Sequence, residues 1–374
     1  MKLRRLSLVV LLLVPETSLA QTPKEELAHL RAVPHEGKAN EASARAWKDV
    51  VHRGPAILPA LLEAMDSADA VSSNWLRTAG DAIVERALLE KKPLPADQLE
   101  HFVNGKKHNG AARRLAYEWL CRLDPKTPDR LLPGMLHDSS PELRRDAVAA
   151  VIRAAESQLA KGDQEAARVA LRRALAGACD KDQVDLLVGQ LEKLGEKIDV
   201  AAHFGFIRQW RLVAPFDNRK ESGFKKVYPP ETKVDVRAVY KGQDEKEARW
   251  VAVTTNDPYG LVNLNKELGK QKGVVAYAYT LVDSPSERTI QLRAGSPNGL
   301  KMFVNGKEVF YRDEYHHGAS VDQYVATATL KAGRNEILLK VCQNEQTEEW
   351  AQDWKFQVRL CDTVGEAVPF SQPK

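Results

Sequence analysis

The chain has 374 residues, of which 28% are charged and 43% hydrophobic, and its mean hydropathy is −0.41. This apolar content excludes a disordered chain, and the 22 Gly and 19 Pro are too few for a fibrous or low-complexity protein. The formal net charge of +4 is small for this length and argues against nucleic acid as a partner. Two or three domains are expected, because a domain usually holds about 100–200 residues.

Residues 1–20 predict a secretory signal peptide. Basic residues at positions 2, 4 and 5 precede an apolar run over 6–14, and the small residues Ser18 and Ala20 mark a cleavage site after Ala20. We therefore expect an exported protein, either secreted or periplasmic. The apolar run is too short to span a bilayer, which takes about 20 residues, and we expect no membrane span later in the chain.

The next part of the chain, over 21–200, predicts helices. Its apolar residues recur three and four positions apart, and good helix formers dominate. Leu-Pro pairs recur at Leu58, Leu94 and Leu132, with intervals of 36 and 38 residues. The clearest unit, over 129–155, joins a Pro-containing helix to a second helix through an Asp-Ser-Ser-Pro turn.

This pattern resembles a HEAT repeat, a helical hairpin with Pro in its first helix, Asp in its turn and Arg in its second helix. The resemblance is good over 129–155, fair over 55–90 and weak over 94–123, and two plain helices near 163–178 and 181–195 would cap the stack. It implies one HEAT-like α-solenoid domain over 21–200, whose surface would hold a protein partner.

Arginine pairs at 113–114, 144–145 and 172–173 lie in the helical part. Residues 21–200 carry 27 Lys and Arg against 28 Asp and Glu, a net charge of −1. We therefore expect these pairs to lie on solvated helix faces, with the 144–145 pair pointing outward. The alternative is a basic binding ridge.

Near Phe204 the apolar pattern changes to alternation, which predicts strands. The predicted strands cover 249–255, 274–281, 289–294, 300–304, 324–330, 337–341 and 354–360. Asn305-Gly306 predicts a two-residue hairpin turn. About nine or ten short strands predict an antiparallel β-sandwich or jelly roll over 201–374, so the chain as a whole is a multidomain α plus all-β protein.

The segments 290–309 and 330–341, with Asn305-Gly306-Lys307 and Leu330-Lys331-Ala332-Gly333, resemble galactose-binding-like β-sandwiches. Such domains are found in carbohydrate-binding modules and as accessory domains of secreted bacterial enzymes. The resemblance implies a carbohydrate-binding fold, but it carries over no ligand residues, since the family has no single set of them.

Strand counting places the loops 265–272, 295–298, 312–320 and 343–353 at one end of the sandwich. Ligand sites tend to lie on such loops, and aromatic faces beside carboxylates and amides suit sugar rings. The candidate ligand-binding residues are Asn298, Arg312, Asp313, Tyr315, His316, His317 and Trp350. The alternative is an exposed polar loop without a ligand.

A metal or catalytic role for these loops is the weaker hypothesis. His316 and His317 are suitable metal ligands, but adjacent side chains of a strand point to opposite faces. A glycosidase pair would need Asp313 or Glu314 about 5–10 Å from Glu348 or Glu349. No motif for nucleophilic, metal or phosphate chemistry supports either role, so we predict no catalytic residue, no cofactor and no metal site.

Other residues with chemical potential are assigned to the core. Tyr277, Tyr279 and Trp354 share the phase of apolar neighbours, whereas Trp350 is expected to be exposed. A hairpin centred near residue 348 would place Cys342 and Cys361 about 20 Å apart along a sheet, so a disulfide between them is not expected. The sequence leaves open whether Cys121 and Cys179 pair.

The preferred hypothesis is an exported, non-catalytic binding or scaffold protein whose sandwich binds carbohydrate or a cell-surface polymer. Residues 201–374 carry 25 Lys and Arg against 22 Asp and Glu, a net charge of +3, so any attraction to polyanions belongs to this part. The first alternative is a module for protein–protein interaction alone. The second is an accessory or catalytic part of a carbohydrate-active hydrolase.

Overall fold

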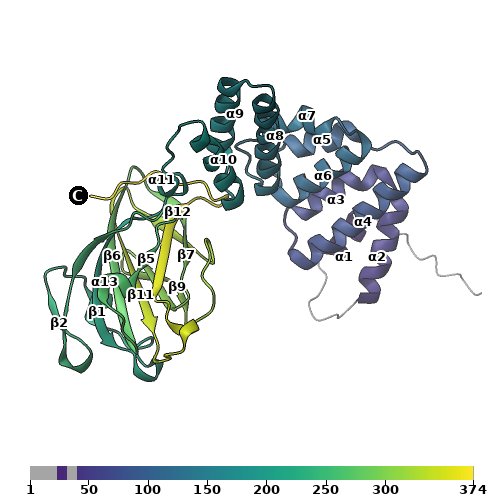
Figure 1. Ribbon diagram of the computed structural model, residues 1–374. Helices are drawn as coiled ribbons and strands as arrows, with labels where there is room; N and C mark the ends of the chain where they lie inside the picture. Colours follow the sequence, from purple (N-terminus) through teal and green to yellow (C-terminus); the bar gives the residue numbers. More distant parts are fainter. Residues whose placement is uncertain (1–22, 32–39, 374) are drawn as a thin grey trace, which may run out of the picture. The chain divides into compact units, whose positions relative to one another are not determined.

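The computed structural model describes residues 23–31 and 40–373. The predicted signal peptide, at 1–20, lies outside the described residues. The chain is helical up to Phe204 and forms antiparallel strands from Gln209 onward, which confirms a helical region followed by β-sheets (Figure 1). Its compact units are Met1–Pro133 and Gly134–Lys374, and each is described by itself. The predicted domain border at residue 200 stays a prediction.

The first unit consists of helices that pack as successive neighbours. They are α1 (Pro23–Arg31), α2 (Asn40–Arg53), α3 (Leu58–Met65), α4 (Ala70–Leu89), α5 (Ala96–Asn104), α6 (Gly110–Leu123) and α7 (Thr127–Leu131), with short 3₁₀ turns η2 (Pro55–Ile57) and η3 (Leu132–Gly134), the last of which reaches into the second unit. Two helix starts are capped by side chains, because Asp69 accepts a hydrogen bond from Ser72 N and Asn109 accepts one from Ala111 N. The pairs α3–α4 and α5–α6 match the hairpins that the sequence predicts over 55–90 and 94–123.

The second unit begins with four helices that continue into the sandwich. They are α8 (Pro141–Ala160), α9 (Gln164–Gly177), α10 (Lys181–Lys193) and α11 (Val200–Phe204). α11 ends at Gly205, whose φ of 75° is left-handed and whose missing side chain leaves room for the carbonyl oxygen of Leu360. This close approach sets α11 beside β12 (Lys355–Cys361), as Figure 1 shows.

Two of the paired arginines are buried, so the expectation of solvated pairs is wrong for them. Arg113 is 1% exposed and its Nε donates to the carbonyl oxygen of Val103 at 2.7 Å. Arg144 is 3% exposed and its Nε donates to the carbonyl oxygen of Gly177 at 2.7 Å. Backbone carbonyls at helix ends need donors, and a guanidinium supplies several in one plane. These two arginines therefore bind helix ends.

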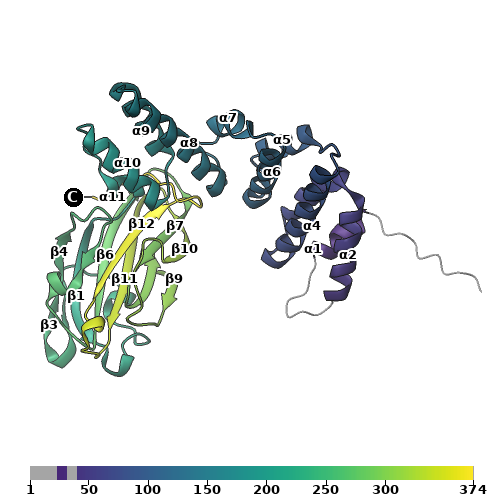
Figure 2. The same ribbon diagram turned by 45° about the vertical axis from the view of Figure 1, so that its right-hand side comes forward.

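The strands form a six-stranded and a four-stranded antiparallel sheet, which agrees with the predicted sandwich. The first sheet has the order β4 (Val251–Thr254), β1 (Gln209–Asp217), β6 (Val274–Ser284), β11 (Gly333–Gln343), β8 (Gly299–Val304), β9 (Lys307–Arg312). The second has the order β10 (Tyr324–Leu330), β7 (Arg288–Gly295), β12, β5 (Val262–Asn263). Figure 2 shows β1, β6 and β11 side by side in the larger sheet. The hairpin at Asn305-Gly306 is confirmed, with φ values of 52° and 78°.

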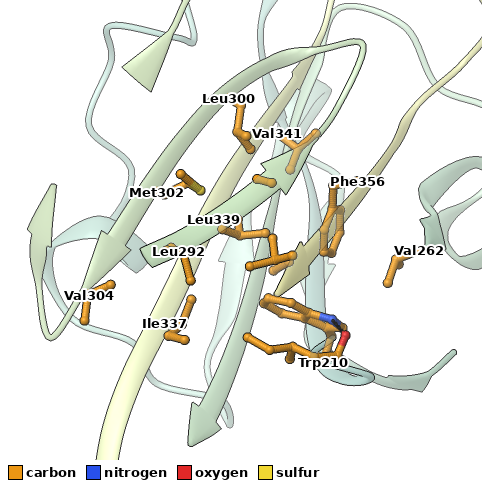
Figure 3. Close-up of a cluster of buried hydrophobic side chains, with 14 of the residues drawn as sticks. Trp210, Val262, Leu292, Leu300, Met302, Val304, Ile337, Leu339, Val341 and Phe356 are labelled. Atoms are coloured by element: carbon orange, nitrogen blue, oxygen red, sulfur yellow. Dashed lines mark hydrogen bonds between the residues drawn. The ribbon is translucent and has the colours of Figure 1, made fainter. Parts of the chain in front are cut away.

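The main core fills the space between the two sheets (Figure 3). Alternate residues of β11, namely Ile337, Leu339 and Val341, face Trp354 and Phe356 of the β12 segment across this space. Trp354 is fully buried, which confirms its predicted core position. Strand alternation explains the arrangement, because every second side chain of a strand points to the same face.

A second core covers part of the outer face of the six-stranded sheet. The segment 218–250, which contains α12 (Pro229–Thr232), β2 (Val239–Lys241) and β3 (Glu247–Arg249), lays Phe224, Tyr228 and Trp250 against this face. The predicted core positions of Tyr277 and Tyr279 are confirmed, but both rings belong to this second core. The sheet therefore has apolar side chains on both faces over part of its area.

The predicted register of the cysteines is wrong. β11 and β12 lie in different sheets, so no hairpin joins them. Cys342 pairs with Val275 and Gly299 in one sheet, and Cys361 pairs with Gln291 in the other. Cys179, Cys342 and Cys361 are free thiols, and burial raises the pKa of the Cys179 thiol to about 11.

Candidate ligand-binding site

The predicted loops meet at one end of the sandwich. His316 N donates to the carbonyl oxygen of Pro297 at 2.6 Å, and Lys272 Nζ donates to the carbonyl oxygen of Ala351 at 2.7 Å. A further loop over 218–222 joins them, since Lys220 N donates to a carboxylate oxygen of Glu345 at 2.7 Å. We call this group of loops the loop end.

Trp350 is the most exposed aromatic side chain of the loop end. It lies in the 3₁₀ turn η6 (Glu349–Ala351), and 62% of its surface is exposed. Its indole meets the ring of His316 edge to face, with ring centres 5.5 Å apart and an angle of 84° between the planes. The indole is therefore in contact with the ring of His316, while most of its own surface stays accessible.

Both the backbone and the ring of His316 are fixed by hydrogen bonds. Its backbone has a φ of 57°, a left-handed conformation that the hydrogen bond to Pro297 secures. Its Nε2 lies 2.5 Å from Oδ1 of Asn344, which makes this nitrogen the hydrogen donor. Asn344 in turn donates to Glu221 at 3.2 Å. The imidazole is thus fixed in orientation before any ligand arrives.

Tyr315 and Asp313 line the same loop. Tyr315 is half-buried, its hydroxyl accepts a hydrogen bond from Asn218 at 3.3 Å, and burial raises its pKa. Burial also raises the pKa of Asp313, the negative charge of Glu221 adds to this effect, and Lys225 opposes it. Asp313 therefore presents a carboxylate next to a second acid.

The remaining candidates have other surroundings. Arg312 pairs with Glu314 at 2.6 Å on the surface. The ring of His317 turns to Tyr324, whose hydroxyl lies 3.0 Å from its Nε2. The side chains of His316 and His317 therefore contact different neighbours. In the described residues, no three His, Cys, Asp or Glu side chains come close enough to hold a metal ion.

Asn298 is buried and has a structural role. Its amide donates to Gln343 Oε1 at 3.2 Å and to the carbonyl oxygen of Asp353 at 3.0 Å, while its own oxygen accepts from Lys355 N at 3.2 Å. These bonds tie the 295–298 loop to the start of β12. Asn298 thus shapes the loop end from inside and does not face a ligand.

The structure brings together Asp313, Tyr315, His316 and Trp350, and it adds Asn344, Glu345, Asn218 and Glu221. The last two follow β1 and were missed by the sequence reasoning, because no strand counting reaches the segment after β1. The polar run over 217–222 immediately after an apolar strand is the signal that would have placed a loop there.

Comparison with known proteins gives only remote similarities. No family model and no curated protein sequence matches the chain. An anti-sigma factor domain-containing protein is similar at 12% identity and a TM-score of 0.23, over 39% of this chain and 51% of that one. A β-glucosidase from Kluyveromyces marxianus is similar at 8% identity and a TM-score of 0.28, over 76% of this chain and 36% of that one. A GH31 α-xylosidase from Xanthomonas citri is similar at 11% identity and a TM-score of 0.19, over 34% of this chain and 18% of that one. The chain thus spans about half or less of each of these structures, and at such TM-scores the similarities carry no functional argument.

Proposed function

We propose that this is an exported, non-catalytic binding protein whose loop end holds a carbohydrate or a saccharide unit of a cell-surface polymer. In this proposal the helical hairpins are HEAT-like and serve as a scaffold for a protein partner, and the sandwich is galactose-binding-like. The signal peptide pattern supports export, and the hairpins and the two antiparallel sheets support the two fold assignments. No helix in the described part of the chain is long and apolar enough to cross a membrane.

The exposed Trp350 ring carries the proposal. A sugar ring offers an apolar C–H face, which stacks on an indole, and hydroxyl groups at its edge, which bond to carboxylates and amides. Trp350 supplies the ring, and the exposed Glu345 and Asp313 supply carboxylates at the loop end, while the buried Asn344 orients His316. An exposed indole that binds nothing would gain little from being held on His316.

Pre-ordering of this ring is the physical reason to expect useful affinity. Binding costs less when side chains are already fixed, since about 0.5–1.5 kcal/mol is lost for each flexible side chain that has to be immobilised. The Trp350–His316–Asn344 chain of contacts is fixed by the hydrogen bond from His316 N to Pro297. The left-handed backbone of His316 is itself unfavourable by about 1–3 kcal/mol, so the rest of the fold has to hold it in place. Such strained residues are common at functional sites.

A glycan array probed with the full chain without residues 1–20, followed by calorimetry on the best ligand, tests the proposal. Replacing Trp350 by Ala is expected to weaken binding by about tenfold, because a ring contact contributes about 0.5–1.5 kcal/mol beyond the area that it buries, and about 1.4 kcal/mol corresponds to about tenfold in affinity. Tyr311→Ala is the matched control, since Tyr311 is an equally exposed aromatic on β9 and takes no part in the loop contacts.

Two outcomes would reject carbohydrate binding at the loop end. One is an array without any saturable ligand. The other is a ligand that the Trp350→Ala variant binds as tightly as the parent protein does. The hypothesis of protein–protein interaction alone would then be the better one.

A further inference from the structure

Two adjoining cavities lie at the opposite end of β1 from the loop end. One has a volume of about 570 Å³ and the other about 370 Å³, and both are lined by Gln209, Thr254 and Gln372. β1 runs from Gln209 to Asp217, so these cavities lie about 25 Å along the strand from the loop end at 3.3 Å per residue. We call the pair the C-terminal cleft.

The larger cavity lies between the start of β1, the segment 254–256 and the C-terminal segment. Its apolar wall consists of Phe206, Val368 and Phe370, and Asn256 and Arg208 add polar groups. Arg208 is already paired with Asp199 at 3.0 Å. The larger cavity therefore has apolar side chains on one side and hydrogen-bonding groups on the other.

The wall between the two cavities is an ordered part of the fold. Gln372 Oε1 accepts from the backbone nitrogens of Arg208 and Gln209 at 3.1 Å each, and Gln372 Nε2 donates to Gln209 O at 2.8 Å. One residue earlier, Ser371 exchanges two backbone hydrogen bonds with Asp283, at 2.8 and 3.1 Å. The C-terminal segment thus acts as a fixed wall of the cleft.

Arg211 is the chemically distinctive residue of the smaller cavity. It pairs with Tyr279 on β6 and with Ala252 on β4, so the three side chains stand in one row on the outer face of the sheet. Arg211 is exposed, and its side chain forms no hydrogen bond or ion pair with any residue that the structure describes. Its guanidinium donors are therefore open to a ligand.

The groups around Arg211 define what the cavity would accept. Arg334 adds a second guanidinium, which forms an ion pair with Asp283 at 3.4 Å. Tyr279 belongs to the second core and only 7% of it is exposed, so a small part of this side chain lines the cavity. Thr254 and Gln209 provide hydroxyl and amide groups opposite. A carboxylate suits the guanidinium fork, and hydroxyl groups suit the remaining wall.

We propose that the C-terminal cleft is a second binding site, which takes a sugar acid with its carboxylate on Arg211 and its hydroxyl groups on Thr254 and Gln209. The sugar acid is either free or one unit of an acidic polysaccharide, with the larger cavity holding the next unit. Volumes of 570 and 370 Å³ fall within the range of about 300–1,000 Å³ that is usual for small-ligand pockets. The inference goes beyond the loop-end proposal and does not depend on it.

An acidic peptide is the competing ligand, and the floor of the cleft disfavours it. A peptide gains affinity by pairing its backbone with a sheet edge. β1 and β6, which form the floor of the cleft, are interior strands with neighbours on both sides, whereas β4, whose residues 252–254 line one side, is the edge strand of the sheet. The floor therefore offers only side chains to a ligand, which suits a short, hydroxyl-rich anion, and a peptide paired with the edge of β4 is the outcome that the tri-glutamate measurement detects.

Calorimetry with the full chain without residues 1–20 tests the site, using galacturonate, its linear trimer, neutral galactose and a tri-glutamate peptide. We expect saturable binding of both acidic sugars, with the trimer tighter, and at least about tenfold weaker binding of galactose, because it cannot engage the guanidinium. A trimer no tighter than the monomer would identify a site for the free acid and would remove the polymer unit from the proposal.

Three variants separate this site from the loop end. Arg211→Gln is expected to lose about tenfold or more of the affinity for galacturonate, and Thr254→Val is expected to lose several-fold with its strand retained. Arg237→Gln is the matched control, since Arg237 is an exposed arginine outside the cleft. Trp350→Ala should leave galacturonate binding unchanged.

The proposal is overturned by any of four results. These are no saturable binding of either acidic sugar, equal binding of galactose, tighter binding of tri-glutamate, or full affinity in both the Arg211→Gln and Thr254→Val variants. Loss of galacturonate binding in Trp350→Ala would also overturn it, because binding would then belong to the loop end.

Discussion

Arg359 shows how a single buried charge organises the sandwich. The residue is 1% exposed, and its Nε and Nη2 reach the carboxylate of Asp322 at 2.6 and 2.5 Å. Its Nη1 donates to the carbonyl oxygens of Phe204 and Gly365 at 3.2 and 2.8 Å. One side chain of β12 thus binds the loop before β10, the end of α11 and the C-terminal segment.

Removing the charge of Asp322 is therefore expected to destabilise this unit strongly. Asp322→Asn keeps the size of the side chain and suits the left-handed backbone, whose φ is 61°. We expect a loss of about 3 kcal/mol in the free energy of unfolding, since breaking a buried ion pair costs about 3–5 kcal/mol and 25% of the Asp322 side chain is exposed. Urea unfolding measures it.

The matched control is Glu245→Gln, which removes a pair with Lys241 whose side chains are 77% and 85% exposed. Its effect is expected to be much smaller than that of Asp322→Asn, because solvent screens an exposed ion pair. A similar loss in both variants would contradict the role given to Asp322.

The pH dependence of stability gives a second check. Burial alone would raise the pKa of Asp322, but Arg359 and Arg293 outweigh it and hold the pKa below its ordinary value of 3.8.

Because the folded state binds this proton more weakly, the contribution of Asp322 is present above about pH 4 and disappears as the pH falls through the folded pKa. The difference in unfolding free energy between the parent protein and Asp322→Asn should therefore shrink below about pH 4. A difference that stays constant down to about pH 2 would show that the pair does not act through its charge.

At the scale of helices and strands, local patterns predict the elements well. Alternation in residues 289–294 and 324–330 predicts β7 and β10, and Asn305-Gly306 predicts the turn between β8 and β9. The reason is that period, turn residues and caps depend on a few neighbouring side chains. The exposed position of Trp350 was also predictable, because it lies in the loop before the strand that follows.

Features that depend on distant partners were not predictable in this way. The β11 and β12 segments follow one another in the chain but lie in different sheets, which no local pattern encodes. Asn298 reads as a polar loop residue, yet it is buried because Gln343, Asp353 and Lys355 satisfy its amide. Arg144 likewise has the sequence features of a surface residue, yet it is buried because the carbonyl oxygen of Gly177 accepts its hydrogen bond. Polar residues become internal only when the fold supplies partners.

Two glycines inside helices test the packing of the helical region. Gly80 of α4 lies against Trp119 of α6, and an added Cβ would come within 2.4 Å of the indole. Trp119 is fully buried and its Nε1 donates to Asp81 at 2.8 Å, so the ring has no room to move. We expect Gly80→Ala to destabilise by about 1–3 kcal/mol, as overpacking outweighs the better helix propensity of alanine.

Gly189 of α10 is the matched control, because an added Cβ there meets no atom within 4 Å. Gly189→Ala is expected to stabilise by about 0.4–1 kcal/mol, since alanine restricts the unfolded chain and suits a helix. Calorimetric unfolding of both variants measures these effects. A Gly80→Ala protein that melts at or above the parent temperature would refute the close packing of α4 and α6.

At the scale of the whole molecule, the change from helices to strands does not coincide with the end of a compact unit. The unit Gly134–Lys374 contains α8 to α11 as well as both sheets. Arg144 of α8 pairs with Glu366 at 2.7 Å, and Tyr259 donates a hydrogen bond to Asp185 of α10. Lys181 lies over the ring of the same tyrosine at 4.4 Å. Through these contacts, α8 and α10 are expected to stabilise the sandwich.

A fragment of residues 134–374 is therefore expected to be more stable than one of residues 201–374. The shorter fragment loses the Arg144–Glu366 pair, the contacts of Tyr259 and the bond of His203 to the carbonyl oxygen of Ala178 at 2.9 Å. Hydrogen bonds to charged groups contribute about 1.5–3 kcal/mol each, so the melting temperature should fall by about 4–8 °C or more. Thermal unfolding followed by circular dichroism measures this difference, and protease should cut the shorter fragment faster near residues 254–260, where Tyr259 has lost its partners. Equal melting temperatures and equal cleavage rates would mean that the helices rest on the sandwich without stabilising it.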